Sequence, residues 1–165
     1  MDYSVYFRPL DPSRFDVYAS KKNLVGHVVR KYTEQDKFPD LEGCHIAIIG
    51  VGEDRGSVRN DGCAQAPDII REKWYELKKS IHPYSIVDMG NLIPGHSIND
   101  TYVALSSIMQ ELLKDGILPV ILGGSQDLTY AQYIAYQCME ETVNIVSVDA
   151  TFDLGSTEEE IRSTT

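Results

Sequence analysis

The chain has 165 residues, the length of one domain or of half of a larger one. Hydrophobic residues make up 42% and charged residues 24%, as in ordinary soluble globular proteins. The formal net charge of −10 argues against a nucleic-acid partner, because nucleic acids bind basic surfaces. No apolar run approaches the length that a membrane-spanning helix needs.

The three cysteines, Cys44, Cys63 and Cys138, form no CxxC pair, so neither a disulfide framework nor a zinc site is indicated. The N-terminus lacks the charged and then apolar pattern of a secretion signal. Reduced thiols are typical of the cytoplasm. We therefore expect a cytoplasmic protein with no nucleic-acid or membrane partner.

The first part of the chain, residues 1–40, is polar, weakly periodic and dotted with aromatic side chains. Pro12 directly after Asp11 favours a short helix over residues 11–18, because proline suits the first helical position. We interpret residues 1–40 as an arm whose aromatic side chains pack on a body formed by residues 41–165.

In the body, apolar strand-like runs alternate with helical periodicity. The runs at 45–52, 85–89, 118–122 and 144–148 predict strands, and residues 68–80, 100–114 and 128–139 predict helices. Because the strands are apolar throughout, both faces of their sheet must be covered. The predicted fold is a three-layer α/β/α domain with a mainly parallel sheet of about four strands.

Glycines follow the first predicted strand, at Gly50, Gly52 and Gly56, in a pattern that invites a dinucleotide-binding interpretation. The spacing does not match the fingerprint, and Glu53 and Asp54 would repel a phosphate. A structural turn that leads into a functional loop fits the sequence better.

That loop continues through Arg55, Arg59 and Asn60, which are candidate substrate-binding residues. A guanidinium grips a carboxylate in a planar fork, so the two arginines suit an anionic group. They are equally well explained as ion-pair partners of Asp54 or Asp61. Both interpretations remain open at this point.

The strongest signal is a pair of motifs that follow the last two predicted strands. Gly123-Gly124-Ser125-Gln126-Asp127 follows one strand, and Asp149-Ala150-Thr151-Phe152-Asp153 follows the next. Ligands of open parallel sheets bind at the carboxyl ends of the strands, so these carboxylates would lie at a site. No GxSxG or HExxH pattern accompanies them, and no catalytic residue is predicted.

With these motifs the chain, from about residue 45 to 153, resembles the first half of the arginase/agmatinase/formimidoylglutamase ureohydrolases. Ala66-Pro67-Asp68-Ile69-Ile70-Arg71 is similar to the family's G-P-x-x-I-R helix start, and Val87-Asp88-Met89-Gly90-Asn91 to its D-x-G-D strand end. The two later motifs are similar to G-G-D-H-S and D-A-H-x-D. The aromatic arm resembles the formimidoylglutamase branch.

The resemblance implies two manganese ions that activate a hydroxide for attack on a guanidinium or amidine carbon. Asp149 and Asp153 stand at retained metal-ligand positions, whereas Gln126 and Thr151 stand where the family has histidines. Ser125 replaces an aspartate, and further ligands belong to the family's second half. We expect no working dinuclear site and no cofactor in this chain.

Three hypotheses follow. The first is the N-terminal domain of a ureohydrolase-like protein that is inactive alone. The second is a metal-dependent hydrolase of linear amidines that becomes active with its C-terminal half. The third is a non-catalytic module that binds a small amidine or anion, or that forms oligomers. Uncovered sheet edges predict a homodimer.

Overall fold

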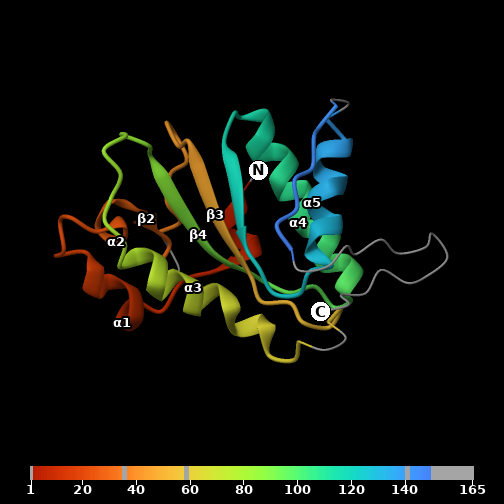
Figure 1. The fold of residues 1–165 in the computed structure, drawn as a ribbon, viewed down its shortest axis with the longest axis horizontal. Coiled ribbons are helices and arrows are strands. Elements are labelled where there is room, and N and C mark those ends of the chain that lie inside the picture. Colours follow the sequence, from red (N-terminus) through yellow and green to blue (C-terminus); the bar gives the residue numbers. More distant parts are fainter. Residues whose placement is uncertain (1, 35–36, 58–59, 140–141, 150–165) are drawn as a thin grey trace.

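The computed structural model describes residues 2–34, 37–57, 60–139 and 142–149, and shows a sheet with helices on both faces (Figure 1). The elements in chain order are η1 (Tyr3–Tyr6), β1 (Phe7–Arg8), α1 (Pro12–Phe15), η2 (Asp16–Tyr18), α2 (Val25–Val28), β2 (Arg30–Lys31), β3 (Ile46–Val51), η3 (Cys63–Gln65), α3 (Ala66–Tyr75), β4 (Ile86–Leu92), α4 (Ile98–Lys114), β5 (Leu118–Leu122) and α5 (Leu128–Gln137). Among the described residues, no helix is long and apolar enough to cross a membrane.

The sheet is centred on β3, which pairs in parallel with β4 on one side and with β5 on the other. Two short strands from the arm extend it beyond β4: β1 pairs antiparallel, with Arg8 opposite Asn91, and β2 pairs in parallel. The order is β1-β4-β3-β5, with β2 also on β4. The predicted α/β fold with a mainly parallel sheet is confirmed, with five strands among the described residues rather than about four.

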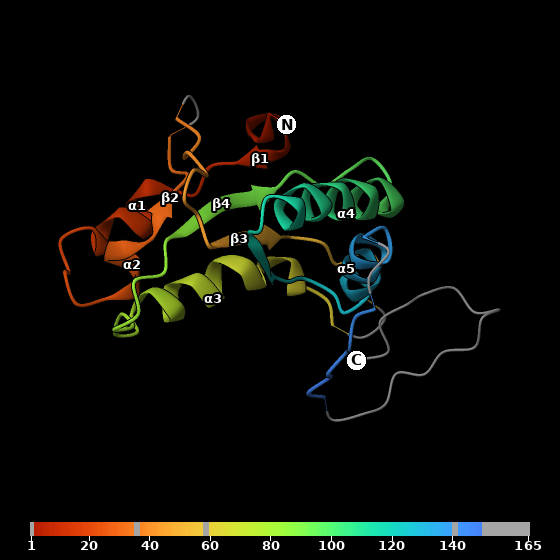
Figure 2. The same cartoon turned by 90° about the horizontal axis from the view of Figure 1, so that it is seen from above.

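The helices lie on opposite faces because the chain reverses direction across the sheet. The connection after β3 leads to β4 on one side of β3. The connection after β4 leads back across the sheet to β5, on the other side of β3. Right-handed crossovers therefore place α3 and α4 on opposite faces, as Figure 2 shows. The reversal creates a switch point between the carboxyl ends of β3 and β5, which is where open α/β sheets bind ligands.

Two apolar clusters hold these layers together. One lies between the sheet and α4 with α5, and its fully buried members include Ile49, Met89, Leu105, Ile108 and Leu112. The other joins the arm to α3, and its buried members are Leu10, Phe15, Tyr18, Val25, Val29 and Tyr75. The arm is thus built into the domain through its aromatic side chains.

Local capping signals place the helix starts. Asp11 accepts a hydrogen bond from the backbone N–H of Ser13, with Pro12 at the first position of α1. Ser97 and Asp100 form a reciprocal capping box at α4. The predicted helix over 68–80 ends earlier, at Tyr75, and the backbone of Leu77 and Lys79 instead bonds to the arm.

The predicted strand over 144–148 is wrong. The structure describes these residues without strand pairing, and Ile145, Val146 and Val148 are 70%, 87% and 98% exposed. A strand requires a neighbouring strand that accepts its hydrogen bonds, and apolar composition alone does not supply one. Within the described residues, β5 pairs only with β3 and its other edge is open.

Candidate functional site at the carboxyl ends of β3 and β5

The segments that follow β3 and β5 cross in close contact at the switch point. The backbone N–H of Ser125 donates to the carbonyl oxygen of Glu53 over 2.8 Å, and the Ser125 hydroxyl donates to the same oxygen over 3.1 Å. A Cβ on Gly124 would lie 2.0 Å from that oxygen, so only glycine permits the approach. The crossing brings the Glu53 and Asp127 carboxylates into one region of the fold.

Glu53 is a buried carboxylate, 2% exposed, that accepts hydrogen bonds from Arg55 and Thr101. Arg55 donates to it through Nε over 2.8 Å and through Nη2 over 2.5 Å, and the Thr101 hydroxyl donates over 3.1 Å. Burial opposes ionisation, but the hydrogen bonds from Arg55 and Thr101 outweigh it and lower the pKa of Glu53. Glu53 is therefore a charged anchor that ties β3 to the start of α4.

The Arg55 guanidinium is already occupied. Besides Glu53, it donates to the carbonyl oxygens of His96, over 2.9 Å, and Gly95, over 3.2 Å. Of the two interpretations of this arginine, the contacts match the ion pair, with Glu53 as the partner rather than Asp54 or Asp61. A substrate-binding role for Arg55 would require these contacts to break.

Asn60, another candidate in this loop, is less constrained than Arg55. The backbone N–H of Asn60 donates to the Ser57 hydroxyl over 2.9 Å, and Asn60 is exposed. Arg59 lies outside the described residues, so its predicted role stays a prediction.

Asp127 is a second buried carboxylate, 5% exposed. Its Oδ2 accepts a short hydrogen bond from the Tyr102 hydroxyl, and its buried Oδ1 has no hydrogen-bond partner in the described part of the chain. Burial and the bond to Asp127 raise the pKa of Tyr102, so this hydroxyl remains a donor. A half-satisfied buried carboxylate costs stability, a common feature of functional sites.

The loop after β3 covers this carboxylate through Gly56. A Cβ at Gly56 would lie 2.4 Å from the Asp127 carboxyl carbon and 2.5 Å from both oxygens. Glycine is therefore required for the loop to close over Asp127. This contact joins the glycine loop to the motif after β5. Gly56 and Asp127 are 71 residues apart in the sequence.

Gln126 and Asp149 meet at the carboxyl end of β5. The Gln126 amide donates from Nε2 to Asp149 Oδ2 over 3.1 Å, across 23 residues. Thr151 and Asp153, the other two predicted metal-site residues, lie outside the described residues. The structure thus brings together two of the four residues that the sequence analysis named as metal-site positions.

The described residues do not fit a manganese centre. They contain no group of three or more His, Cys, Asp or Glu side chains that could hold a metal ion. At Gln126 the atom directed at Asp149 is an amide nitrogen that donates a hydrogen, and such a nitrogen is not a metal ligand. A carboxylate with an amide partner is a poor substitute for carboxylates with imidazoles.

Glu53, Thr101 and Tyr102 are site residues that the sequence analysis missed. Glu53 could have been noted as an acidic residue directly after a buried strand. Tyr102 carries no local signal, because its partner Asp127 lies on another element.

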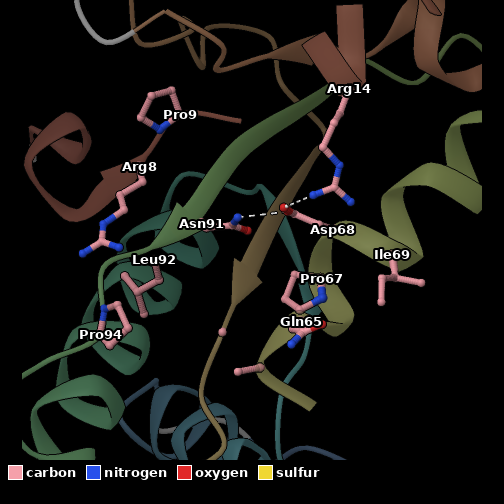
Figure 3. Close-up of a pocket in the computed structure, with 12 residues that line it drawn as sticks. Arg8, Pro9, Arg14, Gln65, Pro67, Asp68, Ile69, Asn91, Leu92 and Pro94 are labelled. Atoms are coloured by element: carbon pink, nitrogen blue, oxygen red, sulfur yellow. Dashed lines mark hydrogen bonds and ion pairs between the residues drawn. The ribbon is translucent and has the colours of Figure 1, made fainter. Parts of the chain in front are cut away.

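A groove lies apart from this cluster, between β1 with the end of β4 on one side and the start of α3 on the other (Figure 3). Its volume is about 550 Å³, within the range of small-molecule sites. We call it the Arg8 groove, and its lining residues are Arg8, Pro9, Arg14, Gly52, Ala64, Gln65, Pro67, Asp68, Ile69, Asn91, Leu92 and Pro94.

The fold is shared with ureohydrolases of known structure. An agmatine ureohydrolase of Thermoplasma volcanium superposes with a TM-score of 0.53 and 22% identity, covering 61% of this chain and 36% of that one. A formiminoglutamase of Trypanosoma cruzi, solved with Mn²⁺, gives a TM-score of 0.54 and 23% identity, covering 58% and 36%.

Sequence relatives point the same way. Formimidoylglutamases of Streptococcus gordonii and Staphylococcus haemolyticus are 24% and 25% identical, covering 93% and 71% of this chain. Those matches cover 48% and 42% of the relatives, so the chain spans about half the length of the curated relatives it matches. The Arginase family model matches residues 44–164. Together with the strand-end motifs and the fold, this match establishes that the chain belongs to the arginase family.

Proposed function

We propose that this chain is a formimidoylglutamase-like domain of the arginase family that lacks a working dinuclear metal centre and is inactive alone. The observation that carries the proposal is the hydrogen bond from Gln126 to Asp149. The family resemblance implies a histidine ligand at position 126. In this chain an amide N–H donor stands there instead.

The donor chemistry supports this proposal. Carboxylates and imidazoles bind manganese, whereas the Gln126 amide and the Thr151 hydroxyl are weak neutral ligands. Altering even the partners of a metal ligand costs roughly 10–100-fold in affinity or activity. Replacing two imidazoles costs more than that. Asp149 and Asp153 alone would hold a hard cation loosely, through oxygen and water.

In a complete protein this domain would shape the cleft rather than perform the chemistry. The Glu53–Arg55 pair fixes the start of the glycine loop, and Gly56 closes that loop over Asp127. Arg59 and Asn60, which follow in the sequence of this loop, are our candidates for contacts with a small amidine or anion. We further propose a cytoplasmic location, because the three free thiols suit a reducing compartment.

A second candidate function is a metal-dependent hydrolase of linear amidines that works when a C-terminal half completes it. The chain spans about half the length of its formimidoylglutamase relatives, which favours this alternative. Asp149, retained at a ligand position, would then contribute a carboxylate.

Metal content and turnover separate these candidates. The purified chain is incubated with Mn²⁺, dialysed and analysed by elemental mass spectrometry. Formimidoylglutamate, agmatine and arginine are then tested for release of formamide or urea. We expect substoichiometric manganese and no turnover. Stoichiometric manganese with turnover would overturn the proposal in favour of the hydrolase.

A restored variant provides the matched comparison. Ser125→Asp, Gln126→His and Thr151→His together return the family's donor types to this chain. We expect the triple variant to retain more manganese than the parent, because imidazoles replace neutral oxygen donors. Equal manganese retention by the parent and the variant would show that the missing donors do not explain weak manganese binding. Thermal stabilisation of the parent by an amidine without metal would favour a binding module.

A further inference from the structure

Two segments of the chain carry positive charge and no negative charge. Residues 17–33 and 77–87 contain no Asp or Glu, although the formal net charge of the whole chain is −10. Their basic residues are Lys21, Lys22, Arg30, Lys31, Lys78 and Lys79. An acidic chain thus concentrates cations in two short segments that are separated in the sequence.

The fold joins these two segments at one end of the molecule. The backbone N–H of Val25 donates to the Leu77 carbonyl oxygen over 2.8 Å, and the backbone N–H of Lys79 donates to the Asn23 carbonyl oxygen over 2.9 Å. A β-bridge connects the same stretches. Figures 1 and 2 show α2 and the segment that follows α3 at the same end of the molecule, away from α5. We call the surface formed there the lysine patch, and its cations are Lys21, Lys22, Lys78 and Lys79.

The lysine patch is not neutralised by the described part of the chain. Its four lysines are exposed, and none of their ammonium groups forms an ion pair or a hydrogen bond with a described residue. The acidic residues that flank the two segments each face a different cation, in the pairs Asp16–Lys31, Glu34–Lys37, Glu76–Lys73 and Asp88–Arg71. The patch therefore presents uncompensated positive charge to solvent.

Apolar side chains are exposed in the same place. Leu77 is 56% exposed and Ile81 is 94% exposed. Tyr84 is 57% exposed, and its ring lies 6.0 Å from the ring of His82. Burial of such side chains against a partner is favourable, while the lysines among them select a partner of negative charge.

This combination favours an acidic protein segment over the other common anions. A nucleic acid offers no aliphatic surface to Leu77 and Ile81, and its long anionic backbone would run against a chain whose net charge is −10. An anionic bilayer would meet the same repulsion. A short peptide avoids it, because charges beyond about 8 Å are largely screened at physiological ionic strength.

We propose that the lysine patch docks an acidic peptide segment of a partner protein, with its four lysines as charge partners and Leu77 and Ile81 as apolar contacts. Neither the Glu53–Asp127 cluster nor any of the predicted metal positions takes part. The proposal therefore goes beyond the proposed function and does not depend on it, and neither metal nor turnover enters its test.

The test is fluorescence anisotropy of a labelled peptide composed of Glu and Leu. A peptide of Gln and Leu removes the charge, and a peptide of Glu and Ser removes the apolar side chains. We expect saturable binding of the Glu–Leu peptide that weakens with added salt, and roughly tenfold weaker binding of the two control peptides. No saturable binding, or equal binding of either control, would overturn the proposal. Tighter binding of single-stranded DNA or of phosphatidylserine vesicles would overturn it in favour of those partners.

Charge reversal locates the site. Lys22→Glu combined with Lys79→Glu should weaken binding of the Glu–Leu peptide roughly tenfold or more. Lys37→Glu combined with Lys114→Glu changes the net charge equally at exposed lysines elsewhere, and it should change the affinity by less than about twofold. Peptide affinity that survives the first double variant, or that falls equally in both, would refute the assignment.

A third variant tests the apolar contact. Ile81→Ser should weaken binding of the Glu–Leu peptide and leave binding of the Glu–Ser peptide unchanged. Because Ile81 is 94% exposed, its replacement should not affect folding, which the melting temperature checks. Unchanged affinity of the Glu–Leu peptide would remove Ile81 from the proposed surface.

Discussion

The hydroxyl of Tyr102, in the first turns of α4, donates a short hydrogen bond to Oδ2 of Asp127, just before α5. Both residues are buried, and the other oxygen of Asp127 has no partner among the described residues. Among the described residues, the Tyr102 hydroxyl is therefore the hydrogen-bond donor to the buried Asp127 carboxylate.

Removing that phenolic hydroxyl should destabilise the fold. In Tyr102→Phe both Asp127 oxygens would be buried without a described donor, which costs about 1–3 kcal/mol of unfolding free energy. Urea denaturation measures the loss. Tyr130→Phe is the matched control, because Tyr130 stacks edge-on against Tyr102 and is 39% exposed. If both variants lose equally little, the bond is not a stabilising contact.

Gly56→Ala should also destabilise the protein, because the added Cβ would lie 2.4 Å from the Asp127 carboxyl carbon. Overpacking of this kind costs typically about 1–3 kcal/mol. Gly123→Ala is the control, because the nearest atom to its added Cβ is 3.9 Å away. The melting temperature should fall for the first variant and hold for the second. A neutral Gly56→Ala would mean that the loop does not rest on Asp127.

The buried pair of Arg71 and Asp88 should dominate the energetics around α3. Asp88 accepts from Arg71 at 2.8 and 3.0 Å and from Tyr75 at 2.7 Å. Arg71→Met would leave Asp88 buried without its cation, which costs about 3–5 kcal/mol. Arg71→Lys, which keeps the charge but loses the planar fork, should fall between Arg71→Met and the parent.

Arg14→Met is the control for this pair. Arg14 also joins an ion-pair cluster on α3, but its side chain is 39% exposed, and exposed pairs contribute up to about 1 kcal/mol. Chemical denaturation of the three variants gives the ranking. Similar losses of unfolding free energy in Arg14→Met and Arg71→Met would contradict the argument that burial makes the loss at Arg71 larger.

Glu53 should contribute to acid sensitivity. Because folding lowers its pKa, its ionised form stabilises the protein above the unfolded-state value of ~4.3. That stabilisation is lost as the pH falls through the lower, folded-state pKa. The urea midpoint of the parent should drop between neutral pH and about pH 3, and Glu53→Gln should drop less. Glu42→Gln, at an exposed position, should follow the parent.

The open edge of β5 and the apolar residues 143–148 lead us to propose self-association with a second copy of this chain. Neither segment carries a charge, so the net charge of the chain does not act directly at either one. Exposed edges pair readily with another strand. Light scattering at tens of micromolar should show a dimer, and Val146→Lys, at an 87% exposed site, should shift it to monomer.

Val5→Lys provides the control for this interface. Val5 is 65% exposed and lies in η1, far along the chain from β5. It should leave the dimer intact, because it adds the same charge elsewhere. A monomeric parent at these concentrations would remove the case for association through the β5 edge.

The amino-acid sequence by itself determined the alternation of strands and helices, including β5 at Leu118–Leu122 and the end of α4 at Lys114. These features depend on apolar periodicity, glycines and capping residues, which act over a few neighbouring positions. The motifs after β5 also indicated the arginase family without the structure.

Only the tertiary structure decided which side chains meet. Arg55 donates to Glu53 and Thr101, Tyr102 donates to Asp127, and β1 of the arm lies across a groove from the start of α3. Residues 144–148 looked like a strand but have no strand partner in the described chain. Contacts between distant segments and strand pairing depend on how elements are arranged in space, and local sequence patterns do not encode that arrangement.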